Sequence, residues 1–430
     1  MKYADSGKLR SLINEMGDYA ALLCEYGRYD SVSEIAARLG NDISNVISEI
    51  KSLEPDPELM AKEPDDYNEI KKLCIGGNKP KAVPDIRERM AGAVLGRFAG
   101  CTLGVPVEGY SIESMKKLAE HDGTGFPPRA YWKTADRSWV LHYETDKRIS
   151  YTRDGINGVA VDDDITYTIL GLLILEKYGF DFTTENVGEL WKEILPYACT
   201  AEHITLNNLK KGVPAMKAGE LDNPYCQWIG ADIRADGFGY AAAGDPELAA
   251  SLAYRDAYLS HRRNGIYGEM FFAAAIAAAF TVSDPIEAVR IGLREIPAEC
   301  TLQKDIEWAL DIGPSLNDFE KARAVIDERF AGMPGAHTNN NACLNVFGFM
   351  LGKGDFTETI AYTVAMGLDN DCTGATAGSI IGAIVGKKGI APHWTERFND
   401  KVKTYLTGYP EMSINDVIDR FVCLYEKSKN

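Results

Sequence analysis

Three short acidic stretches, far apart in the sequence, hold the side chains best suited to chemistry. They are Glu108, the triplet Asp162-Asp163-Asp164, and the pair Asp369 and Asp371. Each stretch stands at the edge of a pattern that predicts a helix. Capping explains one Asp per helix start, because its carboxylate accepts backbone N–H bonds and suits the helix dipole. It does not explain three adjacent carboxylates, because like charges repel unless a cation neutralises them.

The ligand atoms narrow the choice of cation. Carboxylate oxygens without histidine or cysteine suit Mg²⁺, Mn²⁺ or Ca²⁺ and disfavour zinc. None of the nine cysteines forms a closely spaced pair, so no zinc or redox dyad is indicated. The spacing therefore favours a divalent-cation site over coincidental helix caps.

Two glycine stripes predict how these stretches are brought together. Glycines recur every fourth residue at 92, 96, 100 and 104, and again at 374, 378, 382 and 386. Each glycine inside a helix costs about 0.5–1 kcal/mol relative to alanine, so eight of them indicate a compensating contact. Faces without side chains let two helix backbones approach closely. We expect the two helices to pack together; if they run antiparallel, Gly104 lies beside Gly374 and the carboxylates meet.

The rest of the chain also predicts helices. From about residue 83, apolar residues recur with the helical period, and alternating strand patterns are few. The expected helices cover residues 84–104, 164–178, 185–199, 246–260, 265–280, 284–294, 303–311, 316–330, 338–351, 356–366, 373–386 and 413–427. Residues 122–160 are irregular and aromatic, with room for a short hairpin. The predicted fold class is all-α.

Residues 1–80 differ from residues 81–430, which form the main domain. Two helical patterns precede the Pro- and acid-rich residues 54–58, and the composition changes near residues 76–80. The pattern over residues 32–53 has weak helix-turn-helix spacing. Its second helix carries Asn41, Asp42 and Glu49 where a DNA reader needs Arg or Lys. We expect a helical appendage or a dimerisation arm.

Composition and charge exclude several classes of protein. The 46 Lys and Arg against 63 Asp and Glu give a net charge of −17, which disfavours nucleic-acid binding. The start of the sequence has no apolar signal region, and the apolar run from Met270 to Phe280 is too short to span a bilayer. We expect a cytoplasmic protein with neither a membrane nor a nucleic acid as partner. The oligomeric state stays open.

The three acidic blocks resemble those of the ADP-ribosylglycohydrolase family, in the same order. The first block runs from Gly92 to Glu108 and is similar to the family's opening helix and metal-facing Glu. The triplet resembles the Thr-Asp-Asp motif, with Asp162 at the threonine. The block from Asp369 to Gly378 resembles the Asp-x-Asp-Thr/Ser motif before an Ala/Gly helix. The similarity spans about residue 85 to the C-terminus.

This resemblance implies a compact all-α domain with two Mg²⁺ ions, or Mn²⁺ in their place. The implied metal ligands are Glu108, Asp162, Asp163, Asp164, Asp369, Asp371 and Thr373. Family members hydrolyse the bond between the anomeric carbon of ADP-ribose and its acceptor, so the expected partner is an ADP-ribosylated protein or a small ribosylated substrate. The resemblance also implies a carboxylate base, Asp163 or Asp164, with Glu108 in the catalytic group.

Three residues depart from the family pattern. Cys101 stands where many members have Asp, Asp162 replaces the threonine, and Cys372 occupies the Thr/Ser position beside Asp371. The carboxylate that Asp162 adds strengthens cation binding. The acceptor stays open, because its specificity depends on loops.

Five further residues are candidate substrate ligands: His261, Glu269, Asn339, Asn340 and Tyr240. His261 and Glu269 adjoin the start of an apolar helix. The two asparagines begin another helix, whose N–H groups suit a pyrophosphate. Tyr240 has a ring that can stack on a base or sugar. Helix caps, turns and core aromatics explain the same residues without a ligand.

Other functions remain as alternatives. A small N-riboside or nucleoside-like substrate fits the same chemistry. A prenyl-diphosphate enzyme also binds Mg²⁺ with paired acids, but it requires Asp at positions i, i+1 and i+4 of a helix. Here residues 166–168, which follow the triplet, are Thr, Tyr and Thr. A non-catalytic ADP-ribose-binding or regulatory protein is disfavoured, because an unneutralised acidic cluster only costs stability.

Overall fold

The computed structural model describes residues 7–136, 138–143 and 145–429, which divide into two units. The smaller unit contains the described residues up to Ala61 together with Phe330–Met333. The larger unit contains Lys62–Arg329 and the described residues from Pro334 onward. The division therefore falls before the boundary predicted near residue 80. Residues 62–80 join the larger unit; for example, Glu63 accepts a hydrogen bond from the Thr301 N–H at 2.7 Å.

The smaller unit is built from α1 (Gly7–Glu25) and α2 (Tyr29–Lys51), and α3 (Pro57–Lys62) follows them. Neither α1 nor α2 contains a buried residue. The helix α2 runs without a break through Gly40, where a helix-turn-helix needs a turn. The weak helix-turn-helix prediction is corrected on this point: one amphipathic helix continues because its apolar period does not change at that glycine.

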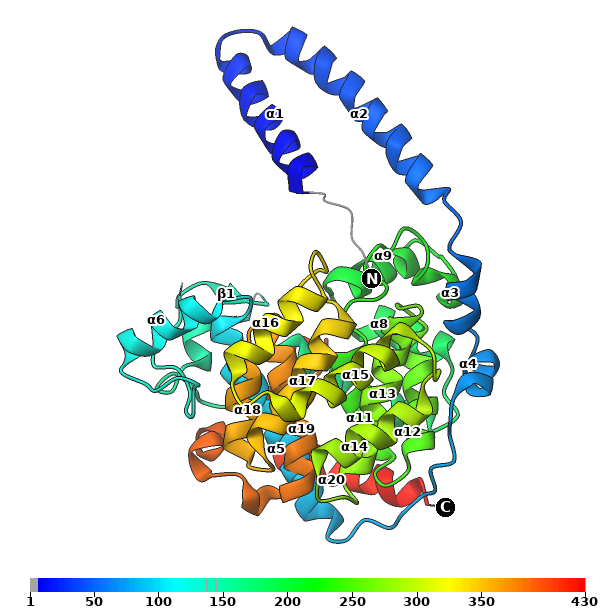
Figure 1. Cartoon of the computed structure of the whole chain (residues 1–430), viewed down its shortest axis with the longest axis vertical. Helices are drawn as coiled ribbons and strands as arrows, with labels where there is room; N and C mark the ends of the chain where they lie inside the picture. Colours follow the sequence, from blue (N-terminus) through cyan, green and yellow to red (C-terminus); the bar gives the residue numbers. More distant parts are fainter. Residues whose placement is uncertain (1–6, 137, 144, 430) are drawn as a thin grey trace. The chain divides into compact units, whose positions relative to one another are not determined.

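The larger unit is all-α, as predicted (Figure 1). Its helices are α4 (Tyr67–Leu73), α5 (Ile86–Gly104), α6 (Ile112–Asp122), α7 (Asp163–Tyr178), α8 (Thr184–Ile194), α9 (Thr200–Lys210), α10 (Ala215–Ala218), α11 (Ala235–Ala241), α12 (Pro246–Ala257), α13 (Asn264–Ala279), α14 (Pro285–Gly292), α15 (Thr301–Ile312), α16 (Phe319–Arg329), α17 (Thr338–Gly352), α18 (Phe356–Ala365), α19 (Asn370–Val385) and α20 (Ile414–Lys427). Short 3-10 helices lie at η1 (Val105–Val107), η2 (Arg148–Tyr151), η3 (Asp232–Arg234), η4 (Leu293–Glu295), η5 (Gly313–Ser315), η6 (Lys387–Gly389), η7 (Pro392–Trp394) and η8 (Glu396–Phe398).

The described strands form two small antiparallel hairpins. Strand β1 (Leu141–His142) pairs with β2 (Asp146–Lys147), inside the region where a short hairpin was expected. Strand β3 (Lys401–Lys403) pairs with β4 (Glu411–Ser413), directly before α20. Both hairpins are too short to form a layer, so helices alone build the core.

The two glycine-rich helices α5 and α19 pack against each other, antiparallel, at the centre of the larger unit (Figure 1). A Cβ atom at Gly92 would lie 2.2 Å from the carbonyl oxygen of Gly382, and one at Gly100 would lie 1.9 Å from that of Gly374. Gly104 meets the Cα of Asp371, 2.3 Å from the position of its absent Cβ. The predicted backbone contact is confirmed, and it brings the end of α5 to the start of α19.

Other helices surround this pair. The helices α17, α18, α13 and α20 pack on it, and every residue of the apolar α13 is buried. The segment Ile86–Val107 is long and apolar enough to cross a membrane, but its apolar window is wholly buried inside the unit. Buried core helices of globular folds meet the same criterion, and this segment is the core helix of the larger unit.

Candidate functional site

The three acidic stretches meet at one end of the α5–α19 pair. Glu108 follows η1 at the end of α5, and Asp369 is the N-cap residue of α19. Carboxylate oxygens of Glu108, Asp369 and Asp371 lie within 4.8 Å of one another. Ligand atoms of Asp164, Asp371 and Cys372 form a second such group. The predicted convergence is therefore present, and Asp371 belongs to both groups.

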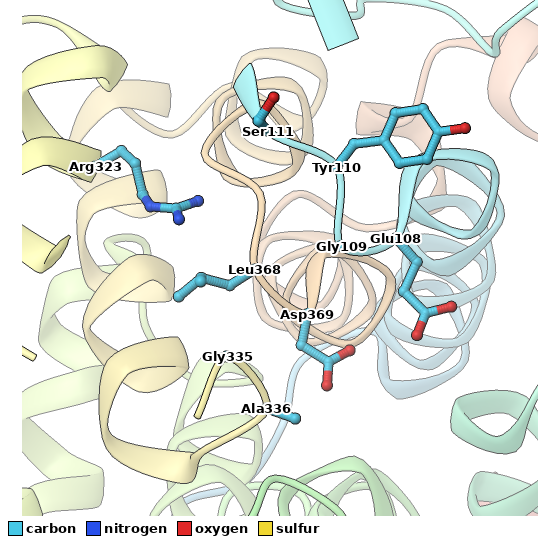
Figure 2. A pocket seen from close by; sticks show the side chains of 9 residues that line it. All are labelled: Glu108, Gly109, Tyr110, Ser111, Arg323, Gly335, Ala336, Leu368 and Asp369. Atoms are coloured by element: carbon cyan, nitrogen blue, oxygen red, sulfur yellow. The ribbon is translucent and has the colours of Figure 1, made fainter. Parts of the chain in front are cut away.

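Two adjoining cavities open around these carboxylates. An inner cavity of about 280 Å³ is lined by Glu108, Tyr143, Asp163, Tyr167, Cys199, Thr200, Glu202, Trp228, Ile229, Gly230, Ile233, Ala336, Asp369, Asp371 and Cys372. An outer cavity of about 360 Å³ is lined by Glu108, Gly109, Tyr110, Ser111, Arg323, Gly335, Ala336, Leu368 and Asp369. Figure 2 shows the outer cavity, with the carboxylates of Glu108 and Asp369 on one side and Arg323 on the other. Glu108, Ala336 and Asp369 line both cavities and join them.

The adjacent acids Asp163 and Asp164 stand in different surroundings. Asp163 lines the inner cavity, whereas Asp164 is fully buried behind it. The Oδ1 atom of Asp164 accepts a hydrogen bond from the buried guanidinium of Arg97 at 2.9 Å. Its Oδ2 atom has no hydrogen-bond partner among the described residues. Asp163 can therefore reach a bound substrate, and Asp164 can reach only an ion held inside.

Asp162 caps the start of α7. Its Oδ1 atom accepts the backbone N–H of Asp164 at 3.0 Å, and its Oδ2 atom lies 3.0 Å from Nε2 of His142. It lines neither of the two cavities. Thr373 is also fully buried, one turn into α19, and its hydroxyl has no partner in the described part of the chain.

Burial and mutual repulsion make this cluster costly without a counter-ion. Burial, with the neighbouring Glu108 and Asp369 charges, raises the pKa of Asp371 well above its ordinary value. Burial likewise raises the pKa of Asp164, although Arg97 opposes the shift. Lost hydration and repulsion from Asp369, Asp162 and Asp163 raise the pKa of Glu108 to about 7, although part of this side chain reaches solvent. Each carboxyl group therefore resists ionisation in the bare protein.

These residues fit a divalent cation. Two buried carboxylate oxygens, Oδ2 of Asp164 and Oδ1 of Asp371, lack hydrogen-bond partners among the described groups, as does the Thr373 hydroxyl. Buried carboxylates are normally paired or bound to metal ions, because an uncompensated charge is expensive. An ion with oxygen ligands neutralises them together. The best-fitting group is Glu108, Asp164, Asp369 and Asp371, with Thr373 in reach of the same helix end.

Several residues that line the inner cavity were not predicted. Glu202 of α9 lies there with 2% of its surface exposed, and Nη1 of Arg234 donates to it at 2.5 Å. Burial raises the pKa of Glu202 to about 7, against the attraction of Arg234. The rings of Tyr143 and Trp228 form apolar parts of the wall. None of the expected helices includes Glu202, and a lone Glu gives no signal of burial, so the sequence could not single it out.

Three predicted substrate ligands lie in the core instead. His261 is fully buried, with Nδ1 at 2.8 Å from the hydroxyl of Ser260. Glu269 accepts from Arg234 at 3.3 Å. The Tyr240 hydroxyl lies 3.0 Å from Asp236 and does not reach a cavity, because the ring packs between helices. None of the three lines the inner or the outer cavity.

The asparagines at the start of α17 also donate to internal partners, although Oδ1 of Asn339 has no partner among the described residues. The amide of Asn339 donates to Asp305 at 2.8 Å, and that of Asn340 donates to the carbonyl oxygen of Pro334 at 3.0 Å. Neither side chain lines the two cavities, whereas the preceding Gly335 and Ala336 do. The turn before α17 therefore contributes backbone, and not these amides, to the wall.

The comparisons with known proteins concern the family and the fold. The sequence profile of the ADP-ribosylglycohydrolase family matches residues 82–427. An uncharacterized protein from Archaeoglobus fulgidus is 26% identical over 330 residues, covering 74% of this chain and 93% of the relative. A solved structure described as an ADP-ribosylglycohydrolase-related protein complex superposes with a TM-score of 0.53 at 19% identity, covering 80% of this chain and 99% of the other. At that identity the structural likeness concerns the fold alone.

Proposed function

Because the chain belongs to the ADP-ribosylglycohydrolase family, we propose that it hydrolyses the glycosidic bond at the anomeric carbon of ADP-ribose on a protein or small-molecule acceptor, with Mg²⁺ or Mn²⁺. One observation carries the proposal. Acidic side chains from three distant segments line one cavity, and buried oxygens of Asp164 and Asp371 lack partners among the described residues. The family makes the chain an ADP-ribosylglycohydrolase-type hydrolase, and the ion and substrate are the proposed part.

The ion's contribution follows from the residues that would hold it. Glu108, Asp369 and Asp371 would hold one divalent cation, and Asp164 with Asp371 would hold a second. Cations there would supply a Lewis acid for the ribose hydroxyls and an acidified water. The residues themselves do the rest. The Asp163 carboxylate, exposed to the cavity, accepts the proton of the attacking water. The anomeric carbon gains that oxygen and loses its bond to the acceptor, which leaves with a proton.

The acidic lining also favours the transition state. Positive charge develops on the sugar as its bond to the acceptor stretches. Glu108, Asp163 and Asp369 face the cavity and are fixed at element ends, so little reorganisation is needed when that charge appears. Asp163 is preferred to Asp164 as the base because Arg97 and burial keep Asp164 from the cavity.

The test is hydrolysis by the wild-type protein and by Asp163→Asn. We expect release of free ADP-ribose from ADP-ribosylated peptides with Mg²⁺ or Mn²⁺, and a loss of about 10²-fold or more in kcat for the variant. Asp419→Asn is the matched control, because that carboxylate is 58% exposed and pairs with Arg87 at the surface. Full activity of Asp163→Asn would exclude Asp163 as the base. No release of ribosyl product by the wild type from any substrate would reject the function.

A small N-riboside is the second candidate substrate, and one observation favours it. Among the described residues that line the inner cavity there is no Lys or Arg, whereas Glu202 adds a further acid. A diphosphate would find a cationic side chain only in the outer cavity, at Arg323. Comparing kcat/KM for an ADP-ribosyl compound and for a simple riboside with the same leaving group decides between them. A diphosphate preference of the wild type that disappears in Arg323→Gln would favour ADP-ribose.

A further inference from the structure

Cys372 stands among the carboxylates of the inner cavity. Its Sγ lies within 4.8 Å of carboxylate oxygens of both Asp164 and Asp371, and its side chain lines the cavity. The thiol is 5% exposed and contacts Asp369 as well. It lies in the first turn of α19 beside Asp371, so the backbone of that helix fixes its position. This sulfur therefore occupies a place that a ligand atom could take.

The oxygens around this sulfur are open to a cation. Oδ1 of Asp371, 3% exposed, and Oδ2 of Asp164, fully buried, have no hydrogen-bond partner in the described part of the chain. Asp164 and Asp371, each with one unpartnered oxygen, and the Cys372 sulfur form one of the two ligand groups that share Asp371. The other group, Glu108, Asp369 and Asp371, offers oxygen alone. The two positions thus differ in ligand chemistry although they share a residue.

We infer that the cation site is asymmetric: Cys372, Asp164 and Asp371 hold a thiophilic divalent ion such as Zn²⁺ or Co²⁺, while the oxygen-only group at Glu108 takes Mg²⁺ or Mn²⁺. The inference rests on the proposed function for the presence of cations. Thiolate ligands select zinc-like ions, and carboxylate ligands suit Mg²⁺ and Mn²⁺. On binding, the Sγ–H bond is replaced by an Sγ–metal bond, and the proton passes to solvent.

Co²⁺ is the probe, because a cobalt–thiolate bond gives a charge-transfer band in the near ultraviolet that oxygen ligands do not give. We expect the band when Co²⁺ is added to the metal-free full-length protein, and its loss in Cys372→Ser. Affinity for Co²⁺ should fall about tenfold or more in the variant while affinity for Mg²⁺ is retained. Cys343→Ser is the matched control, since Cys343 is a fully buried thiol that donates to a backbone carbonyl of Asp305. The cobalt–thiolate band should persist in Cys343→Ser.

A second measurement needs no variant, so it tests the inference even if the Cys372→Ser protein does not fold. X-ray absorption of the zinc-loaded wild type should show a sulfur neighbour at about 2.3 Å from the ion. A shell of oxygen and nitrogen alone, or a cobalt band that persists in folded Cys372→Ser, would overturn the inference. A persisting band would come from Cys101, because its Sγ atom lies within 4.8 Å of ligand atoms of Asp162 and Asp164. Hydrolysis without a sulfur signal leaves the proposed function standing, and a sulfur signal without hydrolysis leaves the asymmetric site standing.

Discussion

Two buried arginines hold acidic residues of the site from behind. Arg97 pairs with Asp164 at 2.9 Å and with Asp236 at 2.6 Å. Arg234 pairs with Glu202 at 2.5 Å. A charge taken out of water must be paired, so each arginine fixes its carboxylates in place. Neither arginine lines the inner or the outer cavity, so both act on the acids from the core side.

The raised pKa values predict how the metal-free protein responds to pH. Glu108 and Glu202 have a pKa of about 7 in the fold, above the unfolded value of about 4.3. Folding therefore favours their protonated forms. The stabilisation is fully present below the unfolded pKa and is lost as the pH rises through about 7. For Glu202, almost fully buried, the loss is on the order of 2–3 kcal/mol.

We expect the chelated protein to melt at a lower temperature at about pH 8 than at about pH 6.5. Divalent ions should raise the melting temperature more at the higher pH, because they compete with protons for the same oxygens. Glu202→Gln should show a smaller pH slope than the wild type in chelator. Burial lowers the pKa of His261 and His337, so these residues oppose the trend from about pH 6.5 downward, where the unfolded imidazole binds a proton and the buried one does not. Equal melting temperatures at the two pH values would contradict the prediction.

At this scale the sequence identified the acids but not their surroundings. Asp163, Asp369 and Asp371 could be predicted because like charges at helix starts imply a counter-ion. Glu202 could not, since its burial depends on how α9 packs. Arg97 carried an overlooked signal: an Arg inside an otherwise Gly- and Ala-rich apolar helix requires buried acids nearby.

At the scale of elements, the backbone contact of α5 with α19 sets the geometry of the site. Gly100→Ala should therefore be strongly destabilising, because the new Cβ would lie 1.9 Å from the carbonyl oxygen of Gly374. The helices must separate, at a cost of about 1–3 kcal/mol or more. Gly171→Ala is the matched control: it is also a buried glycine within a helix, but its Cβ would meet its nearest atom at 3.4 Å. Melting temperatures of both variants check this prediction. Equal values would show that α5 and α19 can move apart at little cost in stability.

The same variant tests the link from packing to the site. Separating the helices near Gly100 should shift Asp371 relative to Glu108, because Asp371 lies in α19 and Glu108 directly follows η1 at the end of α5. Metal affinity should therefore fall in Gly100→Ala at temperatures where the variant is still folded. Unchanged metal affinity, with a lowered melting temperature, would confine the effect to packing.

The glycine stripes made this contact predictable, because only a close approach of two helix backbones offsets the stability cost of so many helical glycines. They indicated which two helices are partners, whereas the antiparallel direction was only a condition of the prediction and comes from the structure. The helix pattern did not predict α6, α9 or α11, which are short or follow irregular segments. Nor could it show that α9 and the turn before α17 form cavity walls, since long-range packing and not local period places them.

On the scale of the whole molecule, the two units differ most in burial. The helices α1 and α2 contain no buried residue, and their exposed side chains include Leu9, Ile35 and Ile50. By contrast, α13 is buried throughout. In proteins most of the stability of a helix comes from tertiary packing of its apolar face. Stability should therefore be distributed very unevenly along the chain.

Hydrogen exchange measures this distribution directly. We expect amides of α1 and α2 in the full-length protein to exchange orders of magnitude faster than those of α5 and α19, whose opening requires nearly global unfolding. The comparison should be made on peptides of similar length by mass spectrometry, with α12 as an internal reference that is partly buried and partly exposed. Adding a divalent ion should slow exchange at the start of α19 and leave α1 unchanged. If α1 and α2 were protected as strongly as α5, their apolar faces would have to be covered in solution, and dilution would show whether a second copy covers them, because only an intermolecular contact weakens with concentration.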